Sequence, residues 1–338
     1  MAIRLIRDLP SYADLSLEYP LSSDTAESIA KHRREITDIL SGVDKRKLII
    51  LGPCSAWNYH AVIQYAYKVS QVQASLADRY KLVMRVYTQK SRTFKGWHGP
   101  LIQPDPKQEC DIAKGLRYCR SLMLEVASFG LAIADELLYT NVNPALTELL
   151  SWGAIGARSS EDQEHRVFAS SLDFAVGIKN PTNGSLAVGL NGVATAQMQH
   201  HAILHGKEVI TSGNGCAHLV LRGGNAMPNY SENHLNDILV MLPRYTISNP
   251  SVIVDASHDN SIVNGVKSYL NQVDVVRYLM QQCKDNQSID KLVKGVMLES
   301  FLVEGRQDIL IGSNYIDGLS ITDACLNWQQ TLDLLFSI

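Results

Sequence analysis

Residues 83–99 read VMRVYTQKSRTFKGWHG and change character midway. The first five, VMRVY, are apolar except for Arg85 and favour a buried strand. Cations and hydroxyls then follow closely: Lys90, Ser91, Arg92, Thr93 and Lys95. Positive charge at the end of a strand suits phosphate and carboxylate oxygens, because Arg offers a two-pronged fork and Lys a point charge. By itself the stretch is equally compatible with a solvated basic turn, so the rest of the chain must decide.

The composition narrows the class of protein. Of 338 residues, 46% are hydrophobic and 19% are charged, which is typical of a globular chain with a large core. A net charge of -3 argues against nucleic acid as a main partner. No stretch is apolar enough to span a membrane, and MAIRLIRDLPSYADL at the N-terminus lacks the apolar segment of a secretory signal. Six cysteines without CxxC spacing indicate reduced thiols, so we expect a cytoplasmic protein.

Eight short apolar runs alternate with longer segments of helical periodicity, such as 60–79, 110–129 and 264–284. The runs lie at 48–51, 82–87, 131–134, 154–157, 174–178, 219–221, 252–254 and 293–298. Eight strands buried on both faces, each followed by a helix, predict an α/β fold of the (β/α)8 TIM barrel type. A doubly wound open sheet is the alternative, but it requires a Gly-rich turn after the first strand, and GPCSAWN is not one.

Two segments do not follow this alternation. Residues 1–45 are expected to form an N-terminal extension, with an edge strand at 2–6 and a helix over 24–40 that packs outside the main body. Asp24 and Glu27 have the spacing of a capping box for that helix. Residues 46–338 are expected to form the catalytic barrel. Between its fifth and sixth strands, residues 181–217 make an excursion with a small hairpin around 202–211, which we interpret as regulatory.

Barrel enzymes carry their chemistry at the carboxyl ends of the strands. Nearly every run here ends in a charged or soft side chain, and burying so many ions is costly unless ligands or partners compensate. Six of these residues are cations, enough for more than one phosphate plus a carboxylate: Arg85, Lys90, Arg92, Arg158, Lys179 and Arg222. Four others offer sulfur, nitrogen and oxygen ligands: Cys54, His258, Glu299 and Asp323.

The second set predicts a metal site. A thiolate, an imidazole and two carboxylates suit Mn, Fe, Co or Zn better than Mg or Ca. A divalent metal ion beside an anion site would polarise a carbonyl next to a phosphorylated partner. Each residue alone has a structural explanation, since a lone Cys is most often a buried apolar residue. Together they predict a metal-dependent barrel enzyme that acts on phosphorylated, carboxylated small molecules.

Eleven motifs occur in order along the chain: GPCS, MRVY, K-x-RT, SWGAIGAR, VGIKN, TSGNG, LRGG, PNYS, DASHDN, GVMLESFLVEG and SITDAC. Through them the chain resembles the class I 3-deoxy-D-arabino-heptulosonate 7-phosphate (DAHP) synthases of the microbial, aromatic-regulated type. The resemblance implies condensation of phosphoenolpyruvate with D-erythrose 4-phosphate to give DAHP and phosphate, the first step of the shikimate pathway to aromatic amino acids. It also implies a metal ion, with Mn as first choice, and a homodimer or homotetramer.

The resemblance assigns a role to each residue set. The metal ligands it implies are Cys54, His258, Glu299 and Asp323. The phosphoenolpyruvate contacts are Arg85, Lys90, Arg158, Lys179 and Arg222, and the erythrose 4-phosphate contacts are Arg92 and Thr93. Among the catalytic residues, Lys90 is our candidate proton donor to the new alkoxide, with a pKa that neighbouring cations lower. Glu136 is expected beside the developing positive charge at C2.

Departures from the family pattern keep two other functions open. Residues 196–210, AQMQHHAILHGKEVI, replace the hairpin that helps form the family's aromatic amino acid site, so we expect no inhibition by Phe, Tyr or Trp. Ser91, His98 and Phe301 also depart from the pattern, which motivates the same chemistry on a modified acceptor aldose phosphate in a secondary-metabolite pathway. A catalytically dead metal- or phosphate-binding paralogue is the third hypothesis, but it requires the loss of a ligand or cation that this chain retains.

Overall fold

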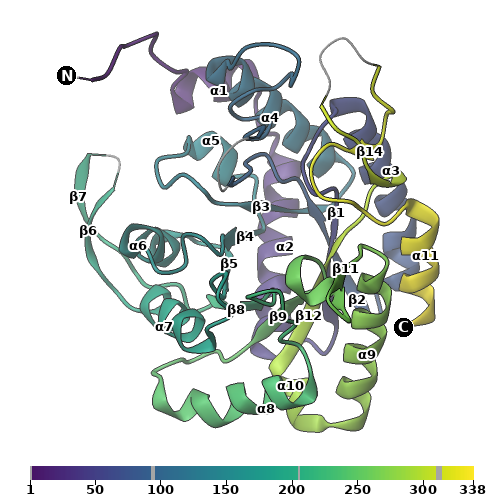
Figure 1. Cartoon of the computed structure of the whole chain (residues 1–338). Helices are drawn as coiled ribbons and strands as arrows, with labels where there is room; N and C mark the ends of the chain where they lie inside the picture. The colour runs from purple at the N-terminus through teal and green to yellow at the C-terminus, as the bar shows by residue number, and fades with distance from the viewer. Residues whose placement is uncertain (1, 93–95, 205, 310–313) are drawn as a thin grey trace.

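A computed structural model, described over residues 2–92, 96–204, 206–309 and 314–338, has a closed barrel of parallel strands (Figure 1). Around the barrel the order is β1-β12-β9-β8-β5-β4-β3-β2. The eight predicted apolar runs each overlap one of these strands, which confirms the (β/α)8 prediction. The strands are β1 (Lys47–Gly52), β2 (Tyr80–Arg85), β3 (Ala132–Glu136), β4 (Trp152–Ile155), β5 (Ala175–Lys179), β8 (His218–Leu221), β9 (Val252–Asp255) and β12 (Val293–Glu299).

Helices cover the outside of the barrel (Figure 1). They are α3 (Tyr59–Leu76), α4 (Ile112–Ser128), α5 (Pro144–Thr147), α6 (Gln163–Ser171), α7 (Leu186–Gln197), α8 (Glu232–Met241), α9 (Asn271–Asp285), α10 (Gln287–Leu292) and α11 (Trp328–Ser337), with the short helices η1 (Leu242–Arg244) and η2 (His258–Ser261). Side chains cap several of them, as when Asn58 accepts from the backbone N of Ala61. The segments predicted at 60–79 and 110–129 correspond to α3 and α4.

The helix predicted at 264–284 begins later than expected, at Asn271. A hairpin of β10 (Ile262–Val263) and β11 (Val266–Lys267) precedes it. Asn264 and Gly265 form its turn with φ of 51° and 78°, in the left-handed region that Asn and Gly tolerate best. This two-residue turn interrupts the helical pattern. A further small sheet pairs β13 (Val303–Arg306) with β14 (Leu319–Ser320).

The barrel interior is filled by alternate residues of the strands, because successive side chains of a strand point to opposite faces. On β1, for example, Leu48 and Ile50 face the interior, whereas Ile49 and Leu51 pack in the layer toward the helices. The interior cluster comprises Leu48, Ile50, Val83, Tyr87, Ala132, Ala134, Trp152, Ala154, Ala175, Val220, Ile253 and Met297 from the strands and the loop after β2.

Helix α2 (Ser23–Ser41) closes one end of this interior. Its Ile36, Ile39 and Leu40 belong to the interior cluster and are essentially inaccessible. The expectation that this helix packs outside the main body is therefore wrong, because the apolar filling of the barrel needs a cover at the amino ends of the strands. The predicted capping box is also wrong, since Ser22 is the N-cap and its side chain accepts from the backbone N of Thr25.

The N-terminal arm lacks the predicted edge strand. Residues 2–10 have no regular structure, and the arm runs outward from α1 (Tyr12–Glu18) in Figure 1. Ile3, Leu5 and Ile6 are each at least 77% exposed. A strand forms only beside a partner strand, so the prediction of a strand over 2–6 is wrong for the isolated chain.

The hairpin predicted around 202–211 is confirmed. It consists of β6 (His201–Leu204) and β7 (Lys207–Ile210), which pair antiparallel with His201 opposite Ile210. In Figure 1 the hairpin projects from the side of the barrel beyond α6 and α7. The connection between β5 and β8 is thus a helix, α7, followed by this exposed hairpin.

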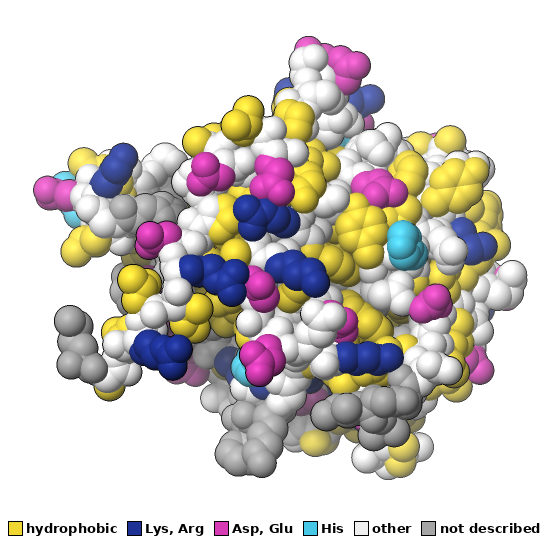
Figure 2. Space-filling view, turned by 90° about the horizontal axis from the view of Figure 1, so that it is seen from above, with side chains coloured by type: hydrophobic (Ala, Val, Ile, Leu, Met, Phe, Trp, Pro, Cys, Tyr) yellow, Lys and Arg dark blue, Asp and Glu magenta, His cyan; other side chains and the backbone are white. Residues whose placement is uncertain are grey.

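No helix in the described part of the chain is long and apolar enough to cross a membrane. Figure 2 shows one face of the molecule, on which Lys and Arg side chains alternate with Asp and Glu side chains. Positive charge on this face therefore does not gather into the continuous basic surface typical of nucleic-acid binding.

His218 is a neutral imidazole inside the barrel. The side chain is fully buried, its Nε2 lies 3.1 Å from the Trp152 Nε1, and its Nδ1 lies 2.8 Å from the Cys216 carbonyl oxygen. A tautomer protonated on Nδ1 satisfies both contacts, since Nε2 then accepts from the indole. Burial lowers the pKa of His218 to about 4.

This geometry predicts acid sensitivity. The unfolded chain binds a proton at His218 near pH 6.5 but the folded chain only near pH 4, so stability should fall as the pH drops through that window. The loss from this residue should reach about 3 kcal/mol. Thermal unfolding at pH 7.5 and pH 5.0 of the wild-type chain and of His218→Gln measures it. A difference between the two chains that does not change with pH would contradict the assignment.

Candidate active site

On six strands, the series of residues that face the barrel interior ends in a charged side chain at or just after the carboxyl end of the strand. These side chains are Arg85, Glu136, Lys179, Arg222, Asp255 and Glu299. Because the strands are parallel and the barrel is closed, these side chains meet at one mouth. Arg85, Asp255 and Glu299 have no exposed surface, and Lys179 is 2% exposed. The mouth is therefore a buried group of charges that must be paired.

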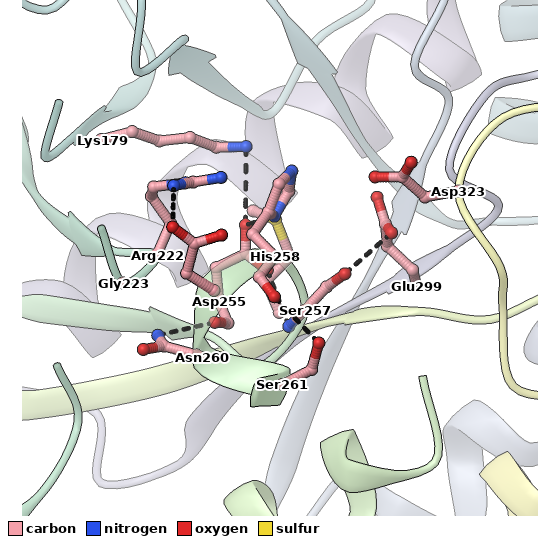
Figure 3. Close-up of polar contacts among 12 residues, drawn as sticks. Lys179, Arg222, Gly223, Asp255, Ser257, His258, Asn260, Ser261, Glu299 and Asp323 are labelled. Atoms are coloured by element: carbon pink, nitrogen blue, oxygen red, sulfur yellow. Dashed lines mark hydrogen bonds and ion pairs between the residues drawn. The ribbon is translucent and has the colours of Figure 1, made fainter. Parts of the chain in front are cut away.

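The charges pair across the mouth, each time between two strands that have one further strand between them. Arg85 Nη2 lies 3.1 Å from Glu299 Oε1. Lys179 Nζ lies 3.2 Å from Glu136 Oε2 and 3.5 Å from Asp255 Oδ2, the contact to Asp255 also being drawn in Figure 3. Burial acts to lower the pKa of Lys179, but Glu136 and other anions outweigh it and leave the pKa raised. Lys179 and its partners thus remain charged.

The Tyr87 ring lies against three of the cations. Its centroid is 3.9 Å from the Arg85 guanidinium carbon, 5.7 Å from Lys179 Nζ and 5.9 Å from Lys90 Nζ. The face of an aromatic ring attracts cations, so Tyr87 helps to hold together charges that repel one another. The sequence predictions did not include Tyr87 in the site. Its position two residues after Arg85, on the same side of the chain, was the available signal.

Arg85 retains unused hydrogen-bond donors. Its Nε and Nη1 are buried, and neither has a hydrogen-bond partner among the residues that the structure describes. A buried donor without a partner costs free energy, so its presence in a folded protein needs an explanation. A carboxylate or phosphate bound in the mouth would accept from these charged donors, and such charge-assisted hydrogen bonds are stronger than neutral ones. This observation indicates an anionic ligand.

Three of the four predicted metal ligands lie together. Ligand atoms of Cys54, Glu299 and Asp323 are all within 4.8 Å of one another, and in Figure 3 the two carboxylates point toward each other. Cys54 follows β1 and Glu299 ends the adjacent β12, so strand pairing brings these two residues close. Burial, together with Glu299, raises the pKa of the Cys54 thiol to about 11. The thiol therefore becomes a thiolate ligand only with a cation beside it, and the donor set fits a divalent transition metal.

His258 lies at the start of η2, outside that group of three. Its Nδ1 is 2.9 Å from Asp255 Oδ2. His258 also has a φ of +53°, a backbone conformation that residues other than Gly rarely adopt. Asp255 was absent from the predicted site residues, although it ends a predicted strand on the inward face. The structure thus places a carboxylate behind the histidine.

Lys90 is surrounded by anionic groups. Its Nζ lies 2.8 Å from the Cys54 carbonyl oxygen and 3.1 Å from Cys54 Sγ. Burial acts to lower the pKa of Lys90, but Cys54, Glu299 and Glu136 outweigh it and the pKa is raised. The prediction of a lowered pKa is therefore wrong, because the residues closest to the ammonium in space are acids and a thiol.

The remaining predicted residues lie further toward the surface. Arg92 Nε donates to the Trp97 carbonyl oxygen at 2.9 Å, and the charge of Arg92 contributes to lowering the pKa of Asp323. Arg222 Nη1 pairs with Asp259 Oδ2 at 3.2 Å. Arg158, after β4, is exposed. Thr93 lies outside the described residues.

The departures from the family pattern lie in different surroundings. Phe301 is fully buried, with its ring 6.0 Å from the ring of Tyr65 on α3. His98 is exposed. Ser91 is partly buried, next to Lys90 in the loop after β2.

A (β/α)8 barrel whose mouth combines a thiol–carboxylate cluster with a buried arginine that has unused hydrogen-bond donors defines a class: barrel enzymes that act on anionic substrates with a bound metal ion. Residues 19–335 match the model of the DAHP synthetase I family, and the chain belongs to that family.

Named relatives support this assignment over nearly the full chain. The chain is 38% identical over 332 residues to the phospho-2-dehydro-3-deoxyheptonate aldolase of Haemophilus influenzae, covering 97% of this chain and 89% of that protein. It is 37% identical over 340 residues to the Phe-sensitive aldolase of Escherichia coli K12, covering 99% and 95%. The solved structure of the corresponding aldolase from Francisella tularensis SCHU S4 matches with a TM-score of 0.91 and 36% identity, over 99% of this chain and 96% of that one.

The buried Arg85–Glu299 pair makes a prediction for stability. Arg85→Met leaves the Glu299 carboxylate buried without its cation and should cost about 3–5 kcal/mol. The double variant Arg85→Met/Glu299→Met should recover most of that loss, because no uncompensated charge remains. Urea unfolding, after a chelator has removed metal ions from the protein, measures the free energy of unfolding of both variants. Additive losses in the double variant would show that the two side chains are not energetically coupled.

Proposed function

We propose that this chain condenses phosphoenolpyruvate with D-erythrose 4-phosphate to give DAHP and inorganic phosphate, the first step of the shikimate pathway. One observation carries the proposal: a group of buried cations, of which Arg85 has unused donors, and a thiol–carboxylate cluster share a single barrel mouth. The first group suits the carboxylate and phosphate of phosphoenolpyruvate, and the second suits a metal ion that acts on an aldehyde. The family and the names of the relatives agree with this reaction.

The metal ion would be held by Cys54, Glu299, Asp323 and His258. Because Nδ1 of His258 faces Asp255, its Nε2 is the nitrogen left for the ion, in the carboxylate–histidine–metal arrangement that proteins commonly use. When bound, a divalent ion supplies Lewis-acid polarisation of the aldehyde carbonyl. The ligand set suits Mn, Fe, Co or Zn, and we take Mn as the first ion to test.

The cations would hold phosphoenolpyruvate with its C3 toward the aldehyde carbon. Arg85 offers its free donors on Nε and Nη1 to oxygens of the substrate, and Lys179 adds a positive charge that is not screened by solvent in the buried mouth. We assign the remaining phosphoenolpyruvate contacts to Lys90, Arg158 and Arg222. Arg92 and Thr93 are assigned to the phosphate of erythrose 4-phosphate.

Two residues would manage charge during the reaction. Lys90 stays protonated, since nearby anions raise its pKa, so it can donate a hydrogen bond to the forming alkoxide and release its proton once that stronger base exists. Burial acts to raise the pKa of Glu136, but Lys179 and Lys90 outweigh it and keep the carboxylate ionised. Glu136 thereby offers negative charge to C2 as water adds there.

We include assembly and compartment in the proposal. The exposed apolar side chains of the arm, such as Ile3 and Leu5, are suited to contact a second subunit in a homodimer or homotetramer. All six cysteines are free, which fits the reducing cytoplasm. Residues 1–45 then act as an arm and barrel cover, and residues 46–338 as the catalytic barrel.

Phosphate release tests the reaction. After chelation the chain should release no phosphate from phosphoenolpyruvate and erythrose 4-phosphate, and added Mn should restore release together with DAHP. Cys54→Ser should lose at least about 100-fold in kcat/KM, because it removes a proposed ligand. Cys110→Ser, which changes an exposed cysteine that the proposed mechanism does not use, is the matched control. Metal-independent release, or release without DAHP, would contradict the proposal.

The hairpin makes a separate prediction about regulation. The β6–β7 hairpin carries His200 and His201 at its base, and Ile203 on it is 82% exposed. Because residues 196–210 do not reproduce the family's inhibitor-binding sequence, saturating Phe, Tyr and Trp should each leave the rate unchanged. The Phe-sensitive Escherichia coli relative, assayed beside it with Phe, is the positive control. Strong inhibition of this chain by any one of the three amino acids would refute the prediction.

A further inference from the structure

Asp135 is a buried carboxylate that the proposed reaction does not use. It precedes Glu136 on β3, so the alternation of the strand turns it away from the mouth, toward α4. Its Oδ1 accepts from the backbone N of Thr88 at 2.9 Å and of Glu136 at 2.7 Å, and its Oδ2 accepts from Thr88 Oγ1 at 2.5 Å. These donors are all neutral, and the ion pairs of the described residues do not include Asp135.

Gln89 makes a second bridge, between the loop after β2 and the loop after β3. Its Oε1 accepts from the backbone N of Leu138 and of Tyr139, each at 3.2 Å. Thr88 and Gln89 begin the loop after β2, whereas Leu138 and Tyr139 lie in the loop after β3. Asp135, Thr88 and Gln89 are at most 2% exposed, so water does not compete for these bonds. We call this set of hydrogen bonds the β2–β3 clamp.

The clamp lies directly beside two residues of the proposed mechanism. Lys90 follows Gln89, and Glu136 follows Asp135. The loop is also closed at its base, since Thr88 O accepts from Leu101 N at 3.1 Å and Lys90 N donates to His98 O at 3.0 Å. Because each residue has only two soft backbone dihedrals, fixing residues 88 and 89 limits where the Cα of Lys90 can lie. From that position its Nζ reaches the carbonyl oxygen and Sγ of Cys54. The clamp thus relates the position of Lys90 to that of Glu136.

Stability alone does not explain an acid at this position. Burial raises the pKa of Asp135 to about 7, although its hydrogen bonds with Thr88 act in the opposite direction. A well-packed apolar side chain would fill the same layer without the desolvation cost of a carboxylate. The carboxylate adds a defined orientation of the two segments, because it accepts hydrogen bonds from three donors on both of them.

We infer that Asp135 is a positioning residue, which acts through the β2–β3 clamp to hold Lys90 and Glu136 in their working arrangement. The inference rests on the proposed function. Asp135 touches neither substrate in that mechanism, so its effect should appear in turnover more than in phosphoenolpyruvate binding, for which Arg85 and Lys179 remain in place.

Two substitutions at one site and a matched control test the inference. Asp135→Ala should lower kcat by about 100-fold, while the KM for phosphoenolpyruvate changes by less than about threefold. Asp135→Asn should return kcat to within about threefold of wild type, because the amide keeps Oδ1 as acceptor and its nitrogen can donate to Thr88 Oγ1. The control is Asn214→Ala. Asn214 is 5% exposed and bonds to Ala169 O, Phe174 O and Cys216 N, outside the mouth.

Asn214→Ala should lower the melting temperature as Asp135→Ala does, with kinetic constants unchanged at a temperature where all variants are folded. A kcat for Asp135→Ala within about threefold of wild type would overturn the inference, as would an equal loss in Asn214→Ala. Should Asp135→Ala not fold, Thr88→Val and Gln89→Leu carry the test, each with an expected loss of about tenfold in kcat. Wild-type kinetics in both would then overturn it.

Measuring the turnover of the wild-type chain first distinguishes a failure of the proposed function from a failure of this inference. A wild-type chain without turnover contradicts the proposed reaction, whatever the clamp does. The clamp is judged separately by amide hydrogen exchange, which should be faster at residues 88–92 in Asp135→Ala and Thr88→Val than in Asn214→Ala. Unchanged exchange at these residues overturns the inference independently of activity.

Discussion

The closed parallel barrel imposes one constraint on which the site depends. Side chains alternate between inside and outside, and all eight strands run in the same direction, so the last inward residue of each strand faces a common mouth. Below that mouth the interior is filled with apolar side chains such as Trp152. The close fit is visible at Gly52, where an added Cβ would lie 2.8 Å from the Arg85 carbonyl oxygen. Charged residues at these positions therefore have to pair with one another or with a ligand.

Glu299 connects the two halves of the site. One of its oxygens lies 3.1 Å from Arg85 Nη2, the other accepts from Ser257 Oγ at 2.8 Å, and its carboxylate also belongs to the cluster with Cys54 and Asp323. The residue that pairs with Arg85, the proposed anion-binding arginine, is thus a candidate metal ligand as well. Because no solvent screens the buried Arg85–Glu299 pair, a change of the bound ligand in one half of the site alters the electrostatic field in the other half.

Pattern reading predicted the strands because residues buried on both faces leave continuous apolar runs, as at 293–298. It was wrong where a neighbour decides the outcome. Residues 2–6 are apolar enough for a strand but have no partner strand. Helix α2 has an ordinary amphipathic pattern, and only the open end of the barrel explains why Ile36 and Ile39 are inside it. The N-cap is Ser22 and not Asp24, and the helix begins at Ser23, one residue before the predicted start at 24, which is within the usual uncertainty of such boundaries.

By itself the sequence determined the barrel, the cations Arg85 and Lys179, and the thiol and carboxylates of Cys54, Glu299 and Asp323, because residue type and local periodicity are encoded along the chain. The tertiary structure decided which of these side chains lie close together and which of them are charged. Lys90 has cations near it in sequence but a thiol and carboxylates near it in space, so its pKa is raised. Tyr87, Asp255 and Asp135 each contact a residue that is distant in the sequence: Lys179 for Tyr87 and Asp255, and Thr88 for Asp135. Electrostatic and hydrogen-bond interactions depend on distance through space, which the order of residues along the chain does not contain.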